Sequence, residues 1–281
     1  MSKPARLVGA WAVAAAALAV GCGDNRGVPS AEVIVECQGG EGGATGPRVL
    51  VWARENLWNH GSNAIAVAAI ANMCETAGVS VVASRDENVF SRERLAEIDV
   101  VVFAVTSGET LGAEARQVLG AWLARGGGLV GIHSASATDL NWPTLTSRLG
   151  PAFRTHGAIV AASLTTATPA HPVLDGVPAR WTHTDEWYNF VEQPELRGMR
   201  PLLVLDETSL PAAYPADLRV GYHALAWVHE QAVLVGDDAG AGGTRTGRTF
   251  YTALGHTEAS YETPAFLLML KQGIEWAGHY R

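Results

Sequence analysis

Residues 126–136 read GGGLVGIHSAS, and this stretch decides the fold class. Glycines lead into a short apolar run that stops at His133. A nearly continuous apolar run is typical of a strand that is covered on both faces of a sheet. Many α/β enzymes hold a serine or cysteine nucleophile at the sharp turn after such a strand, whereas this chain holds a histidine. The stretch therefore predicts a parallel sheet with an imidazole at the end of one strand.

Strands and helices alternate before this stretch. Short apolar runs predict three further strands, at residues 48–53, 79–84 and 99–105. Segments that begin at a polar cap or end at a glycine predict helices at residues 62–78, 91–98 and 112–127. Alternation at this spacing predicts an α/β fold with a doubly wound, mainly parallel sheet and helices on both faces.

The C-terminal half is less regular. Apolar runs predict strands at residues 157–166, 200–208, 224–230 and 248–256. A loop-rich segment is expected at residues 171–190, a turn at 237–247 and a final amphipathic helix at 264–280. No internal repeat interrupts the pattern, so residues 48–281 are expected to form one domain.

Composition narrows the classes of partner. The chain has 281 residues, of which 48% are hydrophobic and 17% charged, and this balance is typical of a globular protein with a large core. The formal net charge is −8, and no run of lysine or arginine occurs. We therefore expect no nucleic-acid partner, because binding to a phosphate backbone requires clustered cations.

The N-terminus is typical of an exported lipoprotein. Residues 1–21 combine a basic start with a short apolar stretch, which predicts a signal peptide. The sequence LAVGC, ending at Cys22, resembles the bacterial lipobox, so residues 22–47 would tether the domain to a bacterial cell membrane through a lipid on Cys22. The alternative is ordinary secretion of a soluble product. Whether Cys37 and Cys74 pair stays open, since spacing alone does not establish disulfide geometry.

Histidines recur where predicted strands end. His60, His133, His229 and His256 each follow or end an apolar run, and the segment before residue 190 adds Asp185 and Glu186. In open α/β sheets, ligands bind outside the carboxyl ends of the strands. One functional pocket is therefore expected at this rim, although any one of these histidines taken alone is more often structural.

Two kinds of chemistry fit such a set. His133, His229 and His256 are candidate ligands of a divalent metal ion, because imidazoles with one open position form catalytic sites. Without a metal, the same groups could perform general acid–base catalysis on a polyhydroxylated substrate. Tryptophans near the predicted rim could stack on sugar rings or simply fill the core; they are Trp52, Trp58, Trp142, Trp181, Trp187 and Trp227.

Six motifs occur in an order that resembles the ThuA-like (trehalose-utilisation) family. They are NHGS, GGGLVGIHSA, HPVLDG, TDEWY, AWVHE and GRTFYTALGHTEASYETPAFLLMLKQGIEWA, and the resemblance covers residues 48–278. It implies a class I glutamine amidotransferase-like fold with a flavodoxin-like sheet, and a role in carbohydrate metabolism. It also implies that the polar positions of the family fall on His60, His133, Asp185, Glu186, His229 and His256. Because His133 replaces the thiol, glutamine hydrolysis through a thioester is not expected.

Two functions are consistent with these features. The first is an exported, membrane-tethered enzyme that acts on a small sugar or glycoside derivative, such as a keto-sugar, by histidine and carboxylate chemistry or with a metal ion. The second is a carbohydrate-binding or sensing lipoprotein without turnover. In either case, the residues expected to contact the carbohydrate are Ser134, Trp187, Tyr188, Glu230 and Glu258.

Overall fold

The computed structural model describes residues 46–235 and 243–281. The predicted signal peptide and lipid anchor, including Cys22 and Cys37, lie outside these residues, as does nearly all of the predicted tether. Within the two described ranges, no helix combines the length and hydropathy needed to cross a membrane.

The described elements follow the predicted alternation through the first half. The strands are β1 (Arg48–Trp52), β2 (Ser80–Ser84), β3 (Val100–Ala104), β4 (Gly128–Ile132), β5 (Phe153–Thr155), β6 (Val160–Thr166), β7 (Arg180–Asp185), β8 (Asn189–Phe190), β9 (Arg200–Asp206), β10 (His223–Val235) and β11 (Gly243–Thr252). The helices are α1 (Ser62–Ala77), α2 (Arg92–Leu95), α3 (Ala113–Ala124), α4 (Pro143–Leu149) and α5 (Pro264–Ala277). Helix α1 ends at Gly78, which adopts the left-handed conformation that stops helices.

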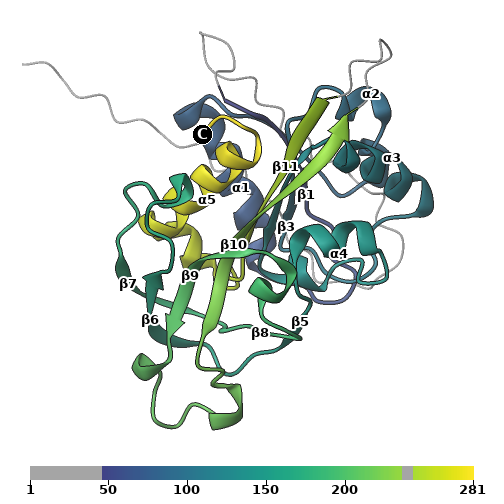
Figure 1. The fold of residues 1–281 in the computed structure, drawn as a ribbon. Helices are drawn as coiled ribbons and strands as arrows, with labels where there is room; N and C mark the ends of the chain where they lie inside the picture. The colour runs from purple at the N-terminus through teal and green to yellow at the C-terminus, as the bar shows by residue number, and fades with distance from the viewer. Residues whose placement is uncertain (1–45, 236–242) are drawn as a thin grey trace, which may run out of the picture. The chain divides into compact units, whose positions relative to one another are not determined.

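One large sheet organises the described residues, in the order β2-β1-β3-β4-β11-β10-β9-β6-β7 (Figure 1). The five strands from β2 to β11 are parallel, and each of the remaining strands is antiparallel to its neighbour. Helices α1 and α5 contact each other on one side of the sheet, and α3 and α4 lie on the other side. The predicted doubly wound α/β class is confirmed.

Three predictions for the second half are wrong in detail. The segment expected to be loop-rich contains the strands β7 and β8. Strand β7 is half-exposed, and its mostly polar residues give no apolar run that would predict a strand. The predicted turn at residues 237–247 overlaps β11, which begins at Gly243. The strand expected at residues 224–230 continues to Val235, because β10 and β11 form a long antiparallel ladder.

Strand direction determines which side chains share an edge of the sheet. Counting two antiparallel steps from β11 to β9, and two more from β9 to β7, makes β7 run in the same direction as β4. The end of β7 at Asp185 therefore lies on the same edge as the end of β4 at Ile132. That edge also carries the loops after β1 and β11.

Candidate functional site

His133 occupies a strained turn directly after β4. Its backbone has φ of +53°, a left-handed conformation that is uncommon for residues other than glycine. The imidazole Nδ1 lies 2.8 Å from the carbonyl oxygen of Ala253. Because a carbonyl only accepts, Nδ1 carries the hydrogen and the lone pair is on Nε2. Complete burial lowers the pKa of His133 to about 3, so the imidazole is neutral.

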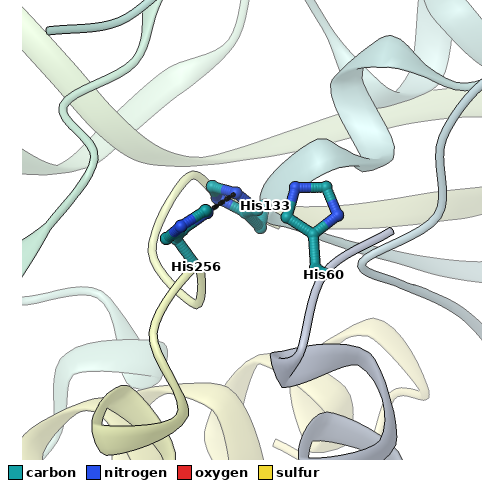
Figure 2. Close-up of side chains that lie close together, drawn as sticks. All are labelled: His60, His133 and His256. Atoms are coloured by element: carbon teal, nitrogen blue, oxygen red, sulfur yellow. Dashed lines mark hydrogen bonds between the residues drawn. The ribbon is translucent and has the colours of Figure 1, made fainter. Parts of the chain in front are cut away.

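Two more imidazoles converge on His133 (Figure 2). His60 comes from the loop between β1 and α1, and His256 from the loop after β11. The ring centroids of the three residues are separated by 5.1, 5.2 and 5.5 Å. One ligand atom from each lies within 4.8 Å of the other two, and His256 Nδ1 is 3.3 Å from His133 Nε2. Three segments distant in sequence therefore form one histidine cluster.

In His60 and His133, the ring nitrogen Nδ1 has a hydrogen-bond acceptor. His60 Nδ1 lies 2.8 Å from Glu55 Oε1, which also accepts the backbone N–H of His60. In the neutral ring, this contact leaves the lone pair of His60 on Nε2, as in His133. Metal-binding histidines usually donate their other ring N–H to a carboxylate or a carbonyl. His60 and His133 both have this arrangement.

Glu186 provides a carboxylate at the cluster. Its Oε2 atom lies 3.2 Å from His256 Nδ1 and 3.6 Å from His133 Nε2, and its Oε1 atom lies 3.4 Å from His156 Nε2. Burial raises the pKa of the Glu186 carboxyl, although nearby His156 opposes this shift. The carboxylate therefore lies between buried His133 and half-buried His256 on one side and exposed His156 on the other.

Asp185 holds the loop that carries His256. Its carboxylate accepts the backbone N–H groups of Gly255 and His256 and the hydroxyl of Ser260. Burial alone would raise the pKa of Asp185, but the hydrogen bond with His183 and the proximity of His133 lower it. Asp185 itself is fully buried and is not among the residues that line the cavity beside the histidine cluster. Its hydrogen bonds indicate that Asp185 has a structural role and supports the loop that carries His256.

A cavity of about 280 Å³ opens in front of these groups. It is lined by Trp58, Asn59, His60, Phe153, His156, Glu186, Tyr188 and His256. Trp58 meets Phe153 edge-on at 5.7 Å, and Phe153 packs against Tyr188 at 4.3 Å. The cavity thus combines an aromatic wall with imidazole and carboxylate groups. A larger hollow of about 440 Å³ near α2 and α3 has several glutamates among its lining residues but no histidine.

The predicted site residues divide into two groups. The structure brings together His60, His133, Asp185, Glu186, Tyr188 and His256. The placement of His229 at the rim is wrong, because β10 runs in the opposite direction and His229 lies within it. His229 pairs with Thr249, which pairs with Leu129, three residues before the end of β4.

The contacts of Arg148, a neighbour of half-buried His229, show where His229 lies instead. Its neighbour Arg148 donates to the carbonyls of Leu123 and Gly127, at the opposite edge of the sheet. Glu230, also expected at the rim, instead lies near Arg200 and Arg248. Both predictions are wrong for the same reason, which is that β10 runs antiparallel to β11 and β9 on either side of it.

The other predicted contact residues lie close to the cavity without lining it. Ser134 is fully buried, and its Oγ atom has no hydrogen-bond partner. Trp187 is also fully buried and belongs to the core, as do Trp52 and Trp227. Glu258 is exposed, with its carboxylate beside Gly61 in the loop of His60. Of the tryptophans considered, Trp58 lines the cavity.

Sequence reasoning missed three residues of this site. Glu55 contacts His60 from within the same loop, and its place five residues before the histidine is the signal that could have identified it. His156 and Phe153 reach the cavity from around the short strand β5, which has no distinctive pattern. Their positions depend on how the chain returns across the edge of the sheet.

The chain belongs to the ThuA family. The model of this family, described as trehalose utilisation, matches residues 48–277. This range contains every side chain of the histidine cluster and the cavity.

Two solved structures share the fold. A ThuA-like protein from Bacteroides uniformis is 20% identical over 83% of this chain and 93% of its own, with a TM-score of 0.66. A ThuA-like protein from Parabacteroides merdae is 20% identical over 84% of this chain and 91% of its own, with a TM-score of 0.61. No curated protein is significantly similar to this chain.

Proposed function

We propose that this protein uses His60, His133 and His256 to bind a divalent cation and acts as an enzyme on a sugar derivative. The observation that carries the proposal is the approach of three imidazole ligand atoms to within 4.8 Å of one another. A tetrahedral zinc site with Zn–N bonds of about 2.0–2.1 Å needs nitrogens roughly 3.3 Å apart. The separation of His133 and His256 fits this value. The ligand atom of His60, within 4.8 Å of the other two, would have to move closer to them when a cation binds.

The protonation state of the cluster supports the same proposal. Cation ligands must be neutral imidazoles, and burial lowers the pKa of both His133 and His256. A cation at this position would supply a Lewis acid that polarises a carbonyl or hydroxyl oxygen of the substrate. Glu186, next to two of the imidazoles, is placed to exchange a proton with a substrate in the cavity.

The aromatic wall supports a carbohydrate as the substrate. Sugar rings present C–H faces that pack on aromatic rings, and Trp58, Phe153 and Tyr188 form such a surface beside the polar groups. The lining includes no lysine or arginine, so an uncharged sugar suits it better than a phosphorylated one. The family description of trehalose utilisation is consistent with this substrate class.

Elemental analysis of the purified full-length protein tests the cation. Near-stoichiometric zinc, manganese or another divalent metal is expected, and substitution of His60 by alanine should remove it. The His229→Ala variant is the matched control, since it removes a half-buried histidine at the other edge of the sheet. A protein that neither retains nor takes up a divalent cation would contradict the proposal.

A thermal-shift screen of sugars in oxidised and reduced forms tests the substrate class. A sugar that binds the folded state should raise the melting temperature, as ligand linkage requires. Sugars that bind should then be incubated with the metal-loaded protein and analysed for conversion. Binding without conversion would favour the alternative of a non-catalytic carbohydrate receptor.

We further propose that the protein is exported and anchored to a bacterial membrane through a lipid on Cys22. The basis is the N-terminal sequence alone, in which a short apolar segment ends at a cysteine. The Cys22→Ser variant should be released from membranes on cell fractionation, because each buried methylene of a lipid chain contributes about 0.8 kcal/mol. Membrane association of that variant would argue against a lipid anchor.

A further inference from the structure

We infer that Tyr188 competes with the cation for His133, so that cation binding must displace the Tyr188 hydroxyl from the imidazole. The Tyr188 oxygen lies 2.7 Å from His133 Nε2. The same nitrogen is the ligand atom that His133 offers to a cation. This inference rests on the cation site proposed above and assigns Tyr188 a role in regulating its occupancy.

The direction of the hydrogen bond follows from the far side of the imidazole. Since Nδ1 of His133 donates to Ala253, Nε2 can only accept in the neutral ring. The Tyr188 O–H must therefore be the donor. The lone pair required by a cation is thus engaged by the Tyr188 O–H.

The two partners exclude each other sterically. A cation bonded to Nε2 would lie about 2.0–2.1 Å from it, close to the line of the lone pair. The phenolic oxygen at 2.7 Å occupies the same region, so it must shift before the bond can form. Displacement of the hydroxyl loses one well-formed hydrogen bond, and this loss weakens cation binding.

Packing restricts how far Tyr188 can move. Its ring lies 4.4 Å from the ring of His133 and 4.3 Å from that of Phe153. Its carbonyl oxygen lies 3.0 Å from His223 Nε2, and the other nitrogen of His223 contacts Glu207. These contacts keep the phenol in the cavity wall. After displacement, its hydroxyl stays beside the cluster as a hydrogen-bond donor for a substrate oxygen.

A competing role and a ligand role for Tyr188 predict opposite results. If the phenol competes, replacement by phenylalanine frees the lone pair and increases cation affinity. If the phenolic oxygen itself bonds to the cation, the same replacement decreases affinity. We commit to competition, because the Tyr188 O–H already donates to the imidazole nitrogen that a cation would need.

The test is titration of the full-length protein, stripped of metal, with Co²⁺, whose visible absorption reports coordination. The Tyr188→Phe variant should bind Co²⁺ about 2- to 12-fold more tightly than the wild type, which is the range for one net hydrogen bond. The Tyr222→Phe variant, which removes an exposed hydroxyl, should match the wild type. Equal or weaker binding by Tyr188→Phe would overturn the inference.

Two controls separate this inference from the proposed function. If neither the wild type nor Tyr188→Phe binds Co²⁺, the cation site itself is wrong. If both bind equally and His133→Ala does not, the site stands and the role of Tyr188 fails. Should Tyr188→Phe fold poorly, proton NMR of the wild type provides a second measurement. The hydrogen-bonded Tyr188 hydroxyl resonance should shift or disappear when Zn²⁺ is added, and its persistence in the loaded protein would overturn the inference.

Discussion

The carboxylate of Asp185, at the end of β7, accepts the backbone N–H of His256, in the loop after β11, at 3.2 Å. Its other oxygen accepts the N–H of Gly255 at 2.8 Å. One buried side chain thus connects two strand ends that are separated by three intervening strands of the sheet. The orientation of the His256 imidazole depends on this connection.

Replacing Asp185 with asparagine should weaken the cation site without removing any ligand. An amide offers one acceptor oxygen where the carboxylate offers two, so at least one N–H or O–H group loses its partner. The free energy of unfolding should fall by about 1–3 kcal/mol, the cost of an unsatisfied buried group. Chemical denaturation and Co²⁺ titration measure the two effects. An unchanged Co²⁺ affinity would show that Asp185 does not position His256.

Replacing Glu55 with glutamine should weaken cation binding by about 10-fold, at the low end of the effect expected for outer partners of metal ligands. The amide preserves shape but removes the negative charge from the group that accepts the Nδ1 hydrogen of His60. Isothermal titration with Zn²⁺ measures the change. Glu258→Gln provides the control, because this exposed carboxylate lies near the same loop without bonding to His60. Similar affinities for both variants would contradict a supporting role for Glu55.

His171 should make the fold sensitive to acid. Its Nδ1 accepts the N–H of Val173, and burial, aided by Arg200, lowers its pKa to about 4. Below its unfolded pKa of about 6.5, the unfolded state binds the proton more readily than the folded state. This contribution to stability is therefore present above pH 6.5 and is lost as the pH falls toward 4, by roughly 2–3 kcal/mol.

The measurement is the free energy of unfolding between pH 7 and pH 4 for the wild type and His171→Asn. Asparagine can still accept the Val173 N–H, since it is a good residue at the start of a helical turn. The variant should lose less stability on acidification than the wild type. Parallel pH profiles would show that His171 does not contribute.

Gly255 should be intolerant of a side chain. Its φ is +117°, and a Cβ atom there would lie 2.6 Å from the hydroxyl oxygen of Tyr261. Gly255→Ala should therefore combine backbone strain with overpacking and lower the free energy of unfolding by about 2–4 kcal/mol.

Gly221→Ala is the matched control for this substitution. Gly221 also has a positive φ, of +79°, but a Cβ atom there would meet nothing within 4 Å. Thermal unfolding should rank Gly255→Ala as the less stable variant, and only that variant should also bind Co²⁺ more weakly. Equal destabilisation would mean that the contact with Tyr261 is unimportant.

The sequence predicts the parallel half of the fold well because each of its strands is a local, apolar pattern. His133 and His60 could be placed from those strands alone, since the carboxyl ends of parallel strands share an edge. His229 could not, because nothing in the sequence around residues 224–230 reveals that β10 runs the other way. The polar residues of β7 do not predict a strand, yet the motif TDEWY still identifies Asp185 and Glu186 as candidate site residues. His156 and Phe153 depend on long-range packing, for which the chain provides no local signal.

The histidine cluster joins parts of the chain that are far apart in sequence, at residues 60, 133 and 256. No unfolded chain can bring these three together without the entropic cost of closing very long loops. An ion held there would act as a reversible cross-link that exists only in the completed fold. The melting temperature of the protein would then depend on the concentration of free ion in its surroundings. The ion content of the compartment in which the chain folds would therefore set its thermal stability.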